Sequence, residues 1–145
     1  MSEHHQVQTN QAFDKSTLTL DVAQETTQIV NLLRQSIHHR LRRQGAVVGI
    51  SGGIDSSVVL GLCAQALGPE RVVGILLPEK DSSAESVTLA QEVATHYRVP
   101  TVVEDITAAL QGLGCYRRRD EAIARVFPEY TPEWKDKITD RKSVV

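Results

Sequence analysis

One stretch of this sequence decides its fold: Ala46-Val47-Val48-Gly49-Ile50-Ser51-Gly52-Gly53-Ile54-Asp55-Ser56-Ser57. Its first half, up to Ile50, is apolar and partly β-branched, which is typical of a buried strand in a parallel sheet. The Ser-Gly-Gly sequence then ends that strand. Apolar residues follow at three- and four-residue spacings, as on one side of a helix that stops at Gly68-Pro69: Val58, Val59, Leu62, Cys63 and Ala66. The pattern predicts a strand, a tight turn and a helix in direct succession.

The predicted turn has the properties of a phosphate-binding site. Backbone N–H groups at the start of a helix lack partners within the helix, and the helix dipole adds partial positive charge there. Glycine allows the backbone to approach a phosphate closely, and serine hydroxyls can donate further hydrogen bonds. A carboxylate beside a phosphate is repulsive unless a cation lies between them, and Mg²⁺ is the natural candidate. We expect phosphate to be bound by Ser51, Gly52, Gly53, Ser56 and Ser57, and Mg²⁺ by Asp55.

Two familiar phosphate loops do not match this stretch. No Gly-Lys-Ser/Thr follows at the Walker spacing, and the dinucleotide pattern Gly-x-Gly-x-x-Gly is absent from it. The pattern Ser-Gly-Gly-x-Asp-Ser, from Ser51 to Ser56, closely resembles the PP-loop of the ATP pyrophosphatase superfamily. Members of that superfamily split ATP into AMP and pyrophosphate to activate a carboxylate, a carbonyl or a similar oxygen. A Gly/Ser turn that merely starts a helix is the simpler alternative, and the position of the motif between a strand and a helix argues against it.

The rest of the sequence predicts alternating helices and strands. A long helix is expected from an N-cap at Asp21 to a stop at Gly45, with its basic end, 38–43, opposing the negative end of the helix dipole. Further strands are expected over 71–78 and 99–104, and helices over 83–97 and 106–113. Such alternation implies a parallel sheet with right-handed crossovers, whose ligands bind beyond the carboxyl ends of the strands. The loop after the second strand, 76–83, could face the same ligand as the Ser-Gly-Gly turn.

Within the superfamily, the sequence is most similar to the NAD synthetase family of amidating ligases. The supporting segments are Val47 to Ser57, Val72 to Pro78, Ser82-Ser83, and Val103 to Ile106. The resemblance covers about 20–110, and only the Ser51–Ser56 motif is highly specific. It implies an α/β protein with a Rossmann-like three-layer α/β/α fold and a parallel sheet, of the adenine nucleotide alpha hydrolase-like type.

The resemblance also implies a reaction and its substrates. The carboxylate of nicotinic acid adenine dinucleotide attacks the α-phosphate of ATP, and ammonia, free or from glutamine, then displaces AMP to leave NAD. On this reading the serines and glycines of the turn hold pyrophosphate, Asp55 places Mg²⁺, and Leu77 lies against adenine. No residue acts as a nucleophile, because both attacking atoms belong to substrates. Synthetases of this kind are dimers, so a homodimer is expected, also because a truncated sheet exposes apolar surface.

Known synthetase domains are considerably longer than this chain. We therefore expect residues 1–18 to form a loose tail and 19–145 to be the N-terminal part of a synthetase-like domain, truncated before its later strands. The segment from Cys115 to Asp120 does not match the usual short synthetase, and its three arginines are interpreted as a solvated or ion-paired helix end. Trp134 fits a packing anchor and a ring for base stacking equally well.

Composition narrows the possible functions. A net charge of −2 gives no general attraction to nucleic acid or to an anionic membrane. Cys63 and Cys115 lack the spacing of metal ligands and are expected to be reduced thiols in a cytoplasmic protein. No metal site is expected at His4-His5 or His38-His39, because no matching set of cysteines or carboxylates accompanies them.

Two other readings stay open. One is another PP-loop enzyme, either GMP synthetase-like or a sulfur-transfer enzyme, although the chain lacks convincing catalytic cysteines or a basic RNA surface. The other is a truncated domain that binds nucleotide or a partner subunit without turnover. Glu79, Asp81 and Glu85 could assist a cation, but a role as loop and first-turn acids that favour a helix N-terminus explains them adequately.

Overall fold

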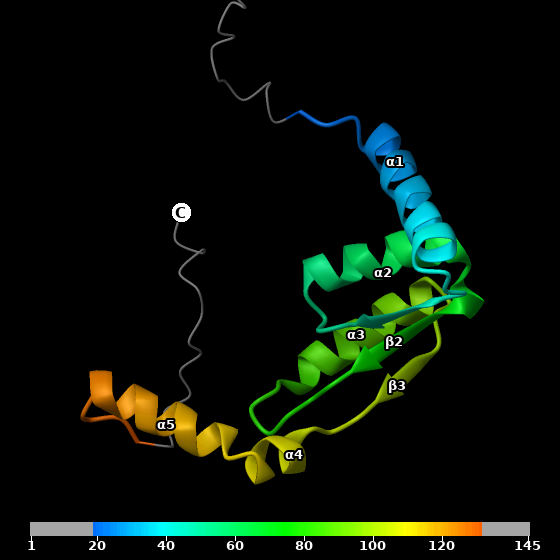
Figure 1. Cartoon of the computed structure of the whole chain (residues 1–145). Helices are drawn as coiled ribbons and strands as arrows, with labels where there is room; N and C mark the ends of the chain where they lie inside the picture. The colour runs from blue at the N-terminus through cyan, green and yellow to red at the C-terminus, as the bar shows by residue number, and fades with distance from the viewer. Residues whose placement is uncertain (1–18, 132–145) are drawn as a thin grey trace, which may run out of the picture.

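The computed structural model describes residues 19–131 and is built around a parallel sheet of three strands, in the order β1-β2-β3 (Figure 1). The strands are β1 (Ala46–Gly49), β2 (Val72–Leu76) and β3 (Thr101–Val103). Both pairings are parallel, with Ala46 opposite Val72 and Gly74 opposite Thr101. All three strands lie within the predicted ranges, and each is shorter than expected, the first only by its last residue, Ile50. The predicted tail, His4-His5 and Trp134 lie outside the described residues.

Helices precede and follow each strand. They are α1 (Val22–Gln35), the π-helix η2 (Ser36–Arg40), α2 (Ile54–Leu67), the 3-10 turn η3 (Pro69–Arg71), α3 (Ala84–His96), α4 (Thr107–Gly112) and α5 (Cys115–Val126). The predicted N-cap of α1 is confirmed, because the Asp21 carboxylate accepts a hydrogen bond of 3.0 Å from the backbone N–H of Gln24. The sequence also predicts that Ser83 begins α3, and its hydroxyl accepts from the N–H of Ser86.

The predicted stop of the first helix at Gly45 is wrong. After Gln35 the helix continues as the π-helix η2, at whose end the N–H of Leu41 donates to the carbonyl of Ser36. Arg42 then takes a left-handed φ of 53° and ends the helix. His38 helps to close this helix end, since its Nδ1 lies 3.0 Å from the carbonyl oxygen of Arg43. Gly45 serves close packing instead, because a Cβ there would run into the carbonyl of Arg71.

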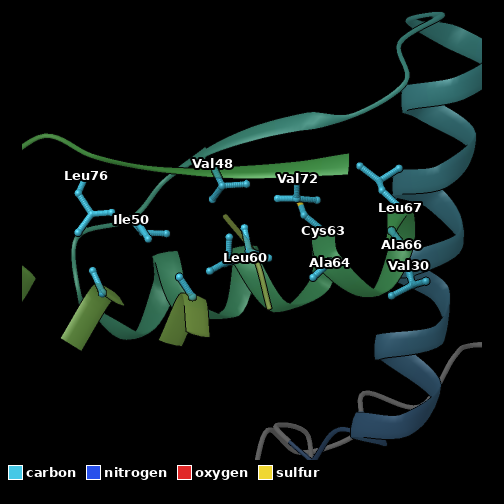
Figure 2. Close-up of a cluster of buried hydrophobic side chains, with 13 residues drawn as sticks. Val30, Val48, Ile50, Leu60, Cys63, Ala64, Ala66, Leu67, Val72 and Leu76 are labelled. Atoms are coloured by element: carbon cyan, nitrogen blue, oxygen red, sulfur yellow. The ribbon is translucent and has the colours of Figure 1, made fainter. Parts of the chain in front are cut away.

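The core lies between one face of the sheet and α2 (Figure 2). Leu60 of α2 and Val72 of β2 are fully buried, and burying side chains of this size stabilises a fold by about 1.5–3 kcal/mol each. α1 packs across the far end of α2, where Val30 joins the cluster and Arg34 Nε donates to the Ala66 carbonyl at 3.0 Å. Cys63 points into this core from α2, as its place in the apolar pattern predicts.

The opposite face of the sheet carries apolar side chains that remain open to solvent. Val47 is 71% exposed and Val102 is 49% exposed, whereas Val48, the neighbour of Val47 along the strand, is buried. Right-handed crossovers that advance steadily from β1 to β3 place α2 and α3 on the same face. The predicted α/β class with a Rossmann-like parallel sheet is confirmed, and among residues 19–131 the helices packed on the sheet cover one of its faces.

The carboxyl ends of the strands form one edge, which positions the candidate site. The pairing continues past each strand, as the N–H of Ile50 bonds to Ile75 and that of Glu104 bonds to Leu76. α4 and α5 lie beyond this edge, and α1 lies at the other end of α2 (Figure 1). The basic segment 38–43 is therefore remote from the Ser-Gly-Gly turn. None of the described helices has the length and apolar character needed to cross a membrane.

Candidate phosphate-binding site

The turn between β1 and α2 is closed by its own serine side chains. Ser56 Oγ accepts from the backbone N–H of Ser51 at 3.2 Å and donates to the carbonyl of Gly53 at 3.0 Å. Ser57 Oγ donates to the same carbonyl at 2.8 Å. Because the hydrogen of Ser56 is used in that bond, the hydroxyl of Ser51, 3.1 Å away, is the donor to Ser56. The serine hydroxyls thus shape the turn, rather than projecting away from it as donors.

Gly52 is the residue that the turn requires to be glycine. Its φ is +79°, a left-handed conformation that costs an ordinary residue about 1–2 kcal/mol. A Cβ at this position would also collide with the carbonyl oxygen of Ser86, in the first turn of α3. The turn therefore lies directly against α3, and this approach of protein backbone requires the absence of a side chain at Gly52. The predicted close approach to a phosphate stays a prediction.

The helix start supplies the hydrogen-bond donors expected of an anion site. Gly53 is the N-cap of α2 and has no side chain that could cap the helix. Its carbonyl accepts a hydrogen bond from the N–H of Ser57. The N–H groups of Ile54, Asp55 and Ser56 precede the first intrahelical bond, so they remain directed out of the helix end. These three donors and the helix dipole together favour an anion at this point.

Asp55 lies in the first turn of α2 and is exposed. Among the described residues its carboxylate takes part in no ion pair. Mg²⁺ at nucleotide sites is held by one or two carboxylates together with phosphate oxygens and water, so a single accessible carboxylate beside a phosphate turn fits this ion. Residues 19–131 contain no preformed cluster of three or more His, Cys, Asp or Glu side chains suited to a metal.

The second loop at this edge, 77–83, follows β2 directly. Leu77 is 47% exposed at the end of the strand, where an apolar ring could cover it. The loop is partly held by its own bonds: Ser82 Oγ accepts from the N–H of Glu79 at 3.0 Å, and Glu79 Oε1 accepts from the N–H of Asp81 at 3.0 Å. Leu77 and the Ser-Gly-Gly turn thus lie at the same edge of the sheet, as the topology predicts.

Helix α5 provides contacts that the sequence reasoning missed. Tyr116 donates its hydroxyl to Glu79 Oε2 at 2.8 Å, and Arg119 pairs with Asp81 at 2.6 Å. The hydrogen bond to Asp81 raises the pKa of Arg119, and burial together with Glu79 raises the pKa of Tyr116. These partners occupy the two loop acids, Glu79 and Asp81. The amphipathic pattern of 115–126 was the available signal for this helix, and nothing local predicts its partners.

Two of the three consecutive arginines at the start of α5, Arg117 and Arg119, form ion pairs, as the sequence interpretation holds. Arg118 instead contacts the thiol of Cys115, at 3.6 Å. Arg117 pairs with Glu121 one turn along the helix at 2.7 Å, and Arg119 pairs with Asp120 at 2.9 Å as well as with Asp81.

Both cysteines are free thiols, and burial raises the pKa of Cys63, so its thiolate is disfavoured.

Comparison with known proteins connects this chain to one family. The profile of the NAD synthase family matches residues 25–124. The NH₃-dependent NAD⁺ synthetase of Mesorhizobium japonicum is 46% identical over 121 residues, which are 83% of this chain and 38% of that protein. The corresponding protein of Rhizobium rhizogenes is 42% identical over 127 residues, again 38% of its length. The chain thus spans under two fifths of the length of these curated relatives.

Solved structures share the fold. An NMN synthetase from Francisella tularensis superposes with a TM-score of 0.59 at 23% identity, covering 78% of this chain and 42% of that one. An NH₃-dependent NAD synthetase from Campylobacter jejuni gives a TM-score of 0.56 at 23% identity, covering 78% of this chain and 44% of that one. At this level of identity the superpositions support the arrangement of strands and helices alone.

Proposed function

This chain belongs to the NAD synthase family, and we propose that it supplies the ATP-binding part of an ATP-dependent ligase that forms NAD. The observation that carries the proposal is the turn between β1 and α2. Its serines close it internally, Gly52 takes a left-handed conformation, and three backbone N–H groups of the helix start remain for an anion. Such a turn suits the pyrophosphate portion of ATP.

The proposed reaction needs charge stabilisation more than chemical groups from the protein. A carboxylate oxygen of nicotinic acid adenine dinucleotide attacks the α-phosphorus of ATP, and the bond from that phosphorus to pyrophosphate breaks. Ammonia then attacks the acyl carbon, AMP leaves, and NAD remains. The growing charge on pyrophosphate is met by fixed N–H donors and the helix dipole, which need no rearrangement during the reaction. No side chain of the site acts as a nucleophile.

The proposed roles of the residues follow from their places. Ser51, Gly52, Gly53, Ser56 and Ser57 surround the pyrophosphate, Asp55 holds Mg²⁺, and Leu77 packs against adenine. When bound, Mg²⁺ neutralises charge on the phosphate oxygens. Asp55 contributes an exposed carboxylate beside the turn, and the exposed apolar surface of Leu77 would be covered by the base.

The names of the relatives support ammonia as the nitrogen donor. The family match also counts against a GMP synthetase-like or sulfur-transfer enzyme. Binding of nucleotide without turnover remains the second candidate, because the chain spans 38% of the length of those relatives. We further propose that the protein acts in the cytoplasm, where its substrates occur and where its two free thiols stay reduced.

Product analysis tests the proposal directly. The chain is incubated with Mg·ATP, ammonia and nicotinic acid adenine dinucleotide, and AMP, pyrophosphate and NAD are measured together. Formation of all three supports the ligase. Binding of Mg·ATP by calorimetry without any product supports the second candidate, and absence of both binding and products overturns the proposed site.

A homodimer is also proposed. Apolar side chains remain exposed on the open face of the sheet, including Val47 at 71%, and on α2, including Ile54 at 76%. Covering such surface favours association. Light scattering at high protein concentration is expected to give twice the mass of the chain, and a monomer mass would contradict this.

A further inference from the structure

We infer that Tyr116 and Arg119 of α5 are positioning residues of the nucleotide site, which act by holding the loop 77–83 at the edge of the sheet. The inference rests on the proposed function, because the site that they serve is the proposed ATP site. Neither residue lies in the Ser51–Ser56 motif, and each is more than thirty residues away in sequence from the loop residue that it contacts.

Three successive loop residues each contact α5. Tyr116 donates to Glu79 at 2.8 Å, the ammonium of Lys80 lies 4.1 Å from the centre of the Tyr116 ring, and Arg119 pairs with Asp81 at 2.6 Å. Positions 116 and 119 are three apart, so they share one face of the helix. One face of α5 therefore holds the tip of the loop through a hydrogen bond to a carboxylate, a cation–π contact and an ion pair.

The guanidinium of Arg119 is itself held in place. Its Nε donates to Asp120 Oδ1 at 3.0 Å, and its carbon lies 5.4 Å from the centre of the Tyr116 ring. Asp120 also accepts from the Tyr130 hydroxyl at 3.0 Å. With its orientation set by these neighbours, Arg119 loses less side-chain entropy on pairing with Asp81 than a mobile surface arginine would.

The loop 77–83 is linked to the turn 51–53 through the first turn of α3. Ser83, at the end of the loop, caps α3 by accepting from the N–H of Ser86 at 3.2 Å. The carbonyl of the same Ser86 lies against Gly52. A continuous set of contacts thus runs from α5 through the loop and the first turn of α3 to the turn that is proposed to bind pyrophosphate. Displacing the loop would move both Leu77 and the surface behind Gly52.

The test compares two arginines of the same helix. Arg119→Ala removes the contact to the loop, whereas Arg117→Ala removes an ion pair of similar length, 2.7 Å, that stays within α5. Mg·ATP affinity is measured by calorimetry for both variants and for Arg119→Lys, which keeps the charge. Asp81→Ala is made alone and with Arg119→Ala to complete a double-mutant cycle. Thermal unfolding of each variant is recorded beside its affinity.

We expect Arg119→Ala to weaken Mg·ATP binding about fivefold, and Arg117→Ala to leave it within about 1.5-fold, in line with partly exposed ion pairs. Arg119→Lys should recover most of the loss, and Asp81→Ala should add little once Arg119 is gone. Equal affinities for the two alanine variants, or losses that simply add in the cycle, would overturn the role of Arg119.

Two further outcomes separate this inference from the proposed function. If the unmodified chain does not bind Mg·ATP, the ATP site itself is wrong and the inference falls with it. If Arg119→Ala fails to fold, Tyr116→Phe decides, because it removes only the hydroxyl that bonds to Glu79. That variant should weaken Mg·ATP binding about twofold with an unchanged unfolding temperature, and unchanged affinity would overturn the positioning role.

Discussion

The two loops at the carboxyl edge of the sheet are held in opposite ways. The turn 51–53 is closed by side chains within six residues of one another, chiefly the hydroxyl of Ser56. The loop 77–83 has a few internal bonds, but its tip is held by Tyr116 and Arg119 from a helix far along the chain. One loop carries its geometry in its own sequence, and the other receives it from tertiary structure.

This difference separates two tasks in a nucleotide site. Phosphate binding requires fixed backbone donors, and a short local motif can provide them at low entropic cost because it closes only a small loop. Contact with a base requires a surface whose position depends on neighbouring elements. The two loops should therefore respond differently to local substitution, salt and pH.

The largest effect is expected from Gly52→Ala, which breaks the local loop. The left-handed φ of +79° and the carbonyl of Ser86 leave no room for a methyl group. We expect a loss of about 1–3 kcal/mol in the free energy of unfolding and more than about tenfold in Mg·ATP affinity. Denaturant unfolding and calorimetry measure both.

Gly112→Ala is the matched control for that substitution. Gly112 lies in α4 with open space around its Cα, so alanine should be neutral or stabilise by up to about 1 kcal/mol. Equal destabilisation by the two alanines would show that Gly52 has no special place in the turn.

Ser56→Ala should have the next largest effect. It removes the bonds from Ser56 Oγ to the Ser51 N–H and the Gly53 carbonyl while leaving the backbone free of strain. At about 1 kcal/mol for a typical hydrogen bond, we expect Mg·ATP affinity to fall about fivefold. Thr88→Ala removes a comparable hydroxyl, bonded to the Ala84 carbonyl in α3, and should leave the affinity unchanged. Matching losses in the two variants would contradict local closure.

Added salt should distinguish the loop 77–83 from the turn 51–53, with a smaller effect than the substitutions above. The pair between Arg119 and Asp81 is partly exposed, with side-chain exposures of 37% and 52%, so added ions weaken it. Hydrogen exchange is followed in low salt and in about 0.5 M NaCl. Amides of the loop 77–83 are expected to exchange about twofold faster in high salt, and those of 51–57 at an unchanged rate. Parallel changes in both loops would argue against different modes of support.

The smallest effect concerns the titration of Tyr116. Burial and Glu79 raise its pKa above the usual 10.0, so the neutral phenol is favoured in the folded chain. Its contribution to stability is therefore complete below pH 10 and is lost as the pH rises through the raised pKa. Glu79→Gln should lower that pKa towards 10.0, as followed by NMR of ring-labelled tyrosine. An unchanged titration would show that Glu79 does not hold Tyr116.

The same contrast explains what the sequence could and could not predict. The strand, turn and helix around 51–57 were predictable because apolar composition, glycine and helix-start physics all act over a few residues. The N-cap role of Asp21 and the start of a helix near Ser83 were predictable for the same reason. The stop at Gly45 was predicted incorrectly, since the π-helix and the left-handed Arg42 close the helix earlier.

The buried face of α2 was predicted only in part. Cys63 and Ala66 are buried, but Val58 and Val59 are about half exposed. The fully buried Leu60 was not in the predicted pattern.

The contacts of α5 were beyond sequence reasoning. The charge pattern of 115–121 correctly indicates an ion-paired helix, but Arg117 finds its partner one turn away and Arg119 finds one in a distant loop. Neighbouring residues of the same type thus differ in role through tertiary placement alone. The strand pattern also could not show which face of the sheet is exposed, because valine and isoleucine occur on both faces.

The central claim is that the turn between β1 and α2 binds the pyrophosphate portion of ATP. The most direct measurement is an amide NMR titration of the isotope-labelled chain with Mg·ATP. The account predicts that the largest shifts fall on Gly52, Gly53 and the helix start at 54–56, with smaller shifts at 77–83. Shifts centred on the basic segment 38–43, or no shifts at saturating nucleotide, would contradict it.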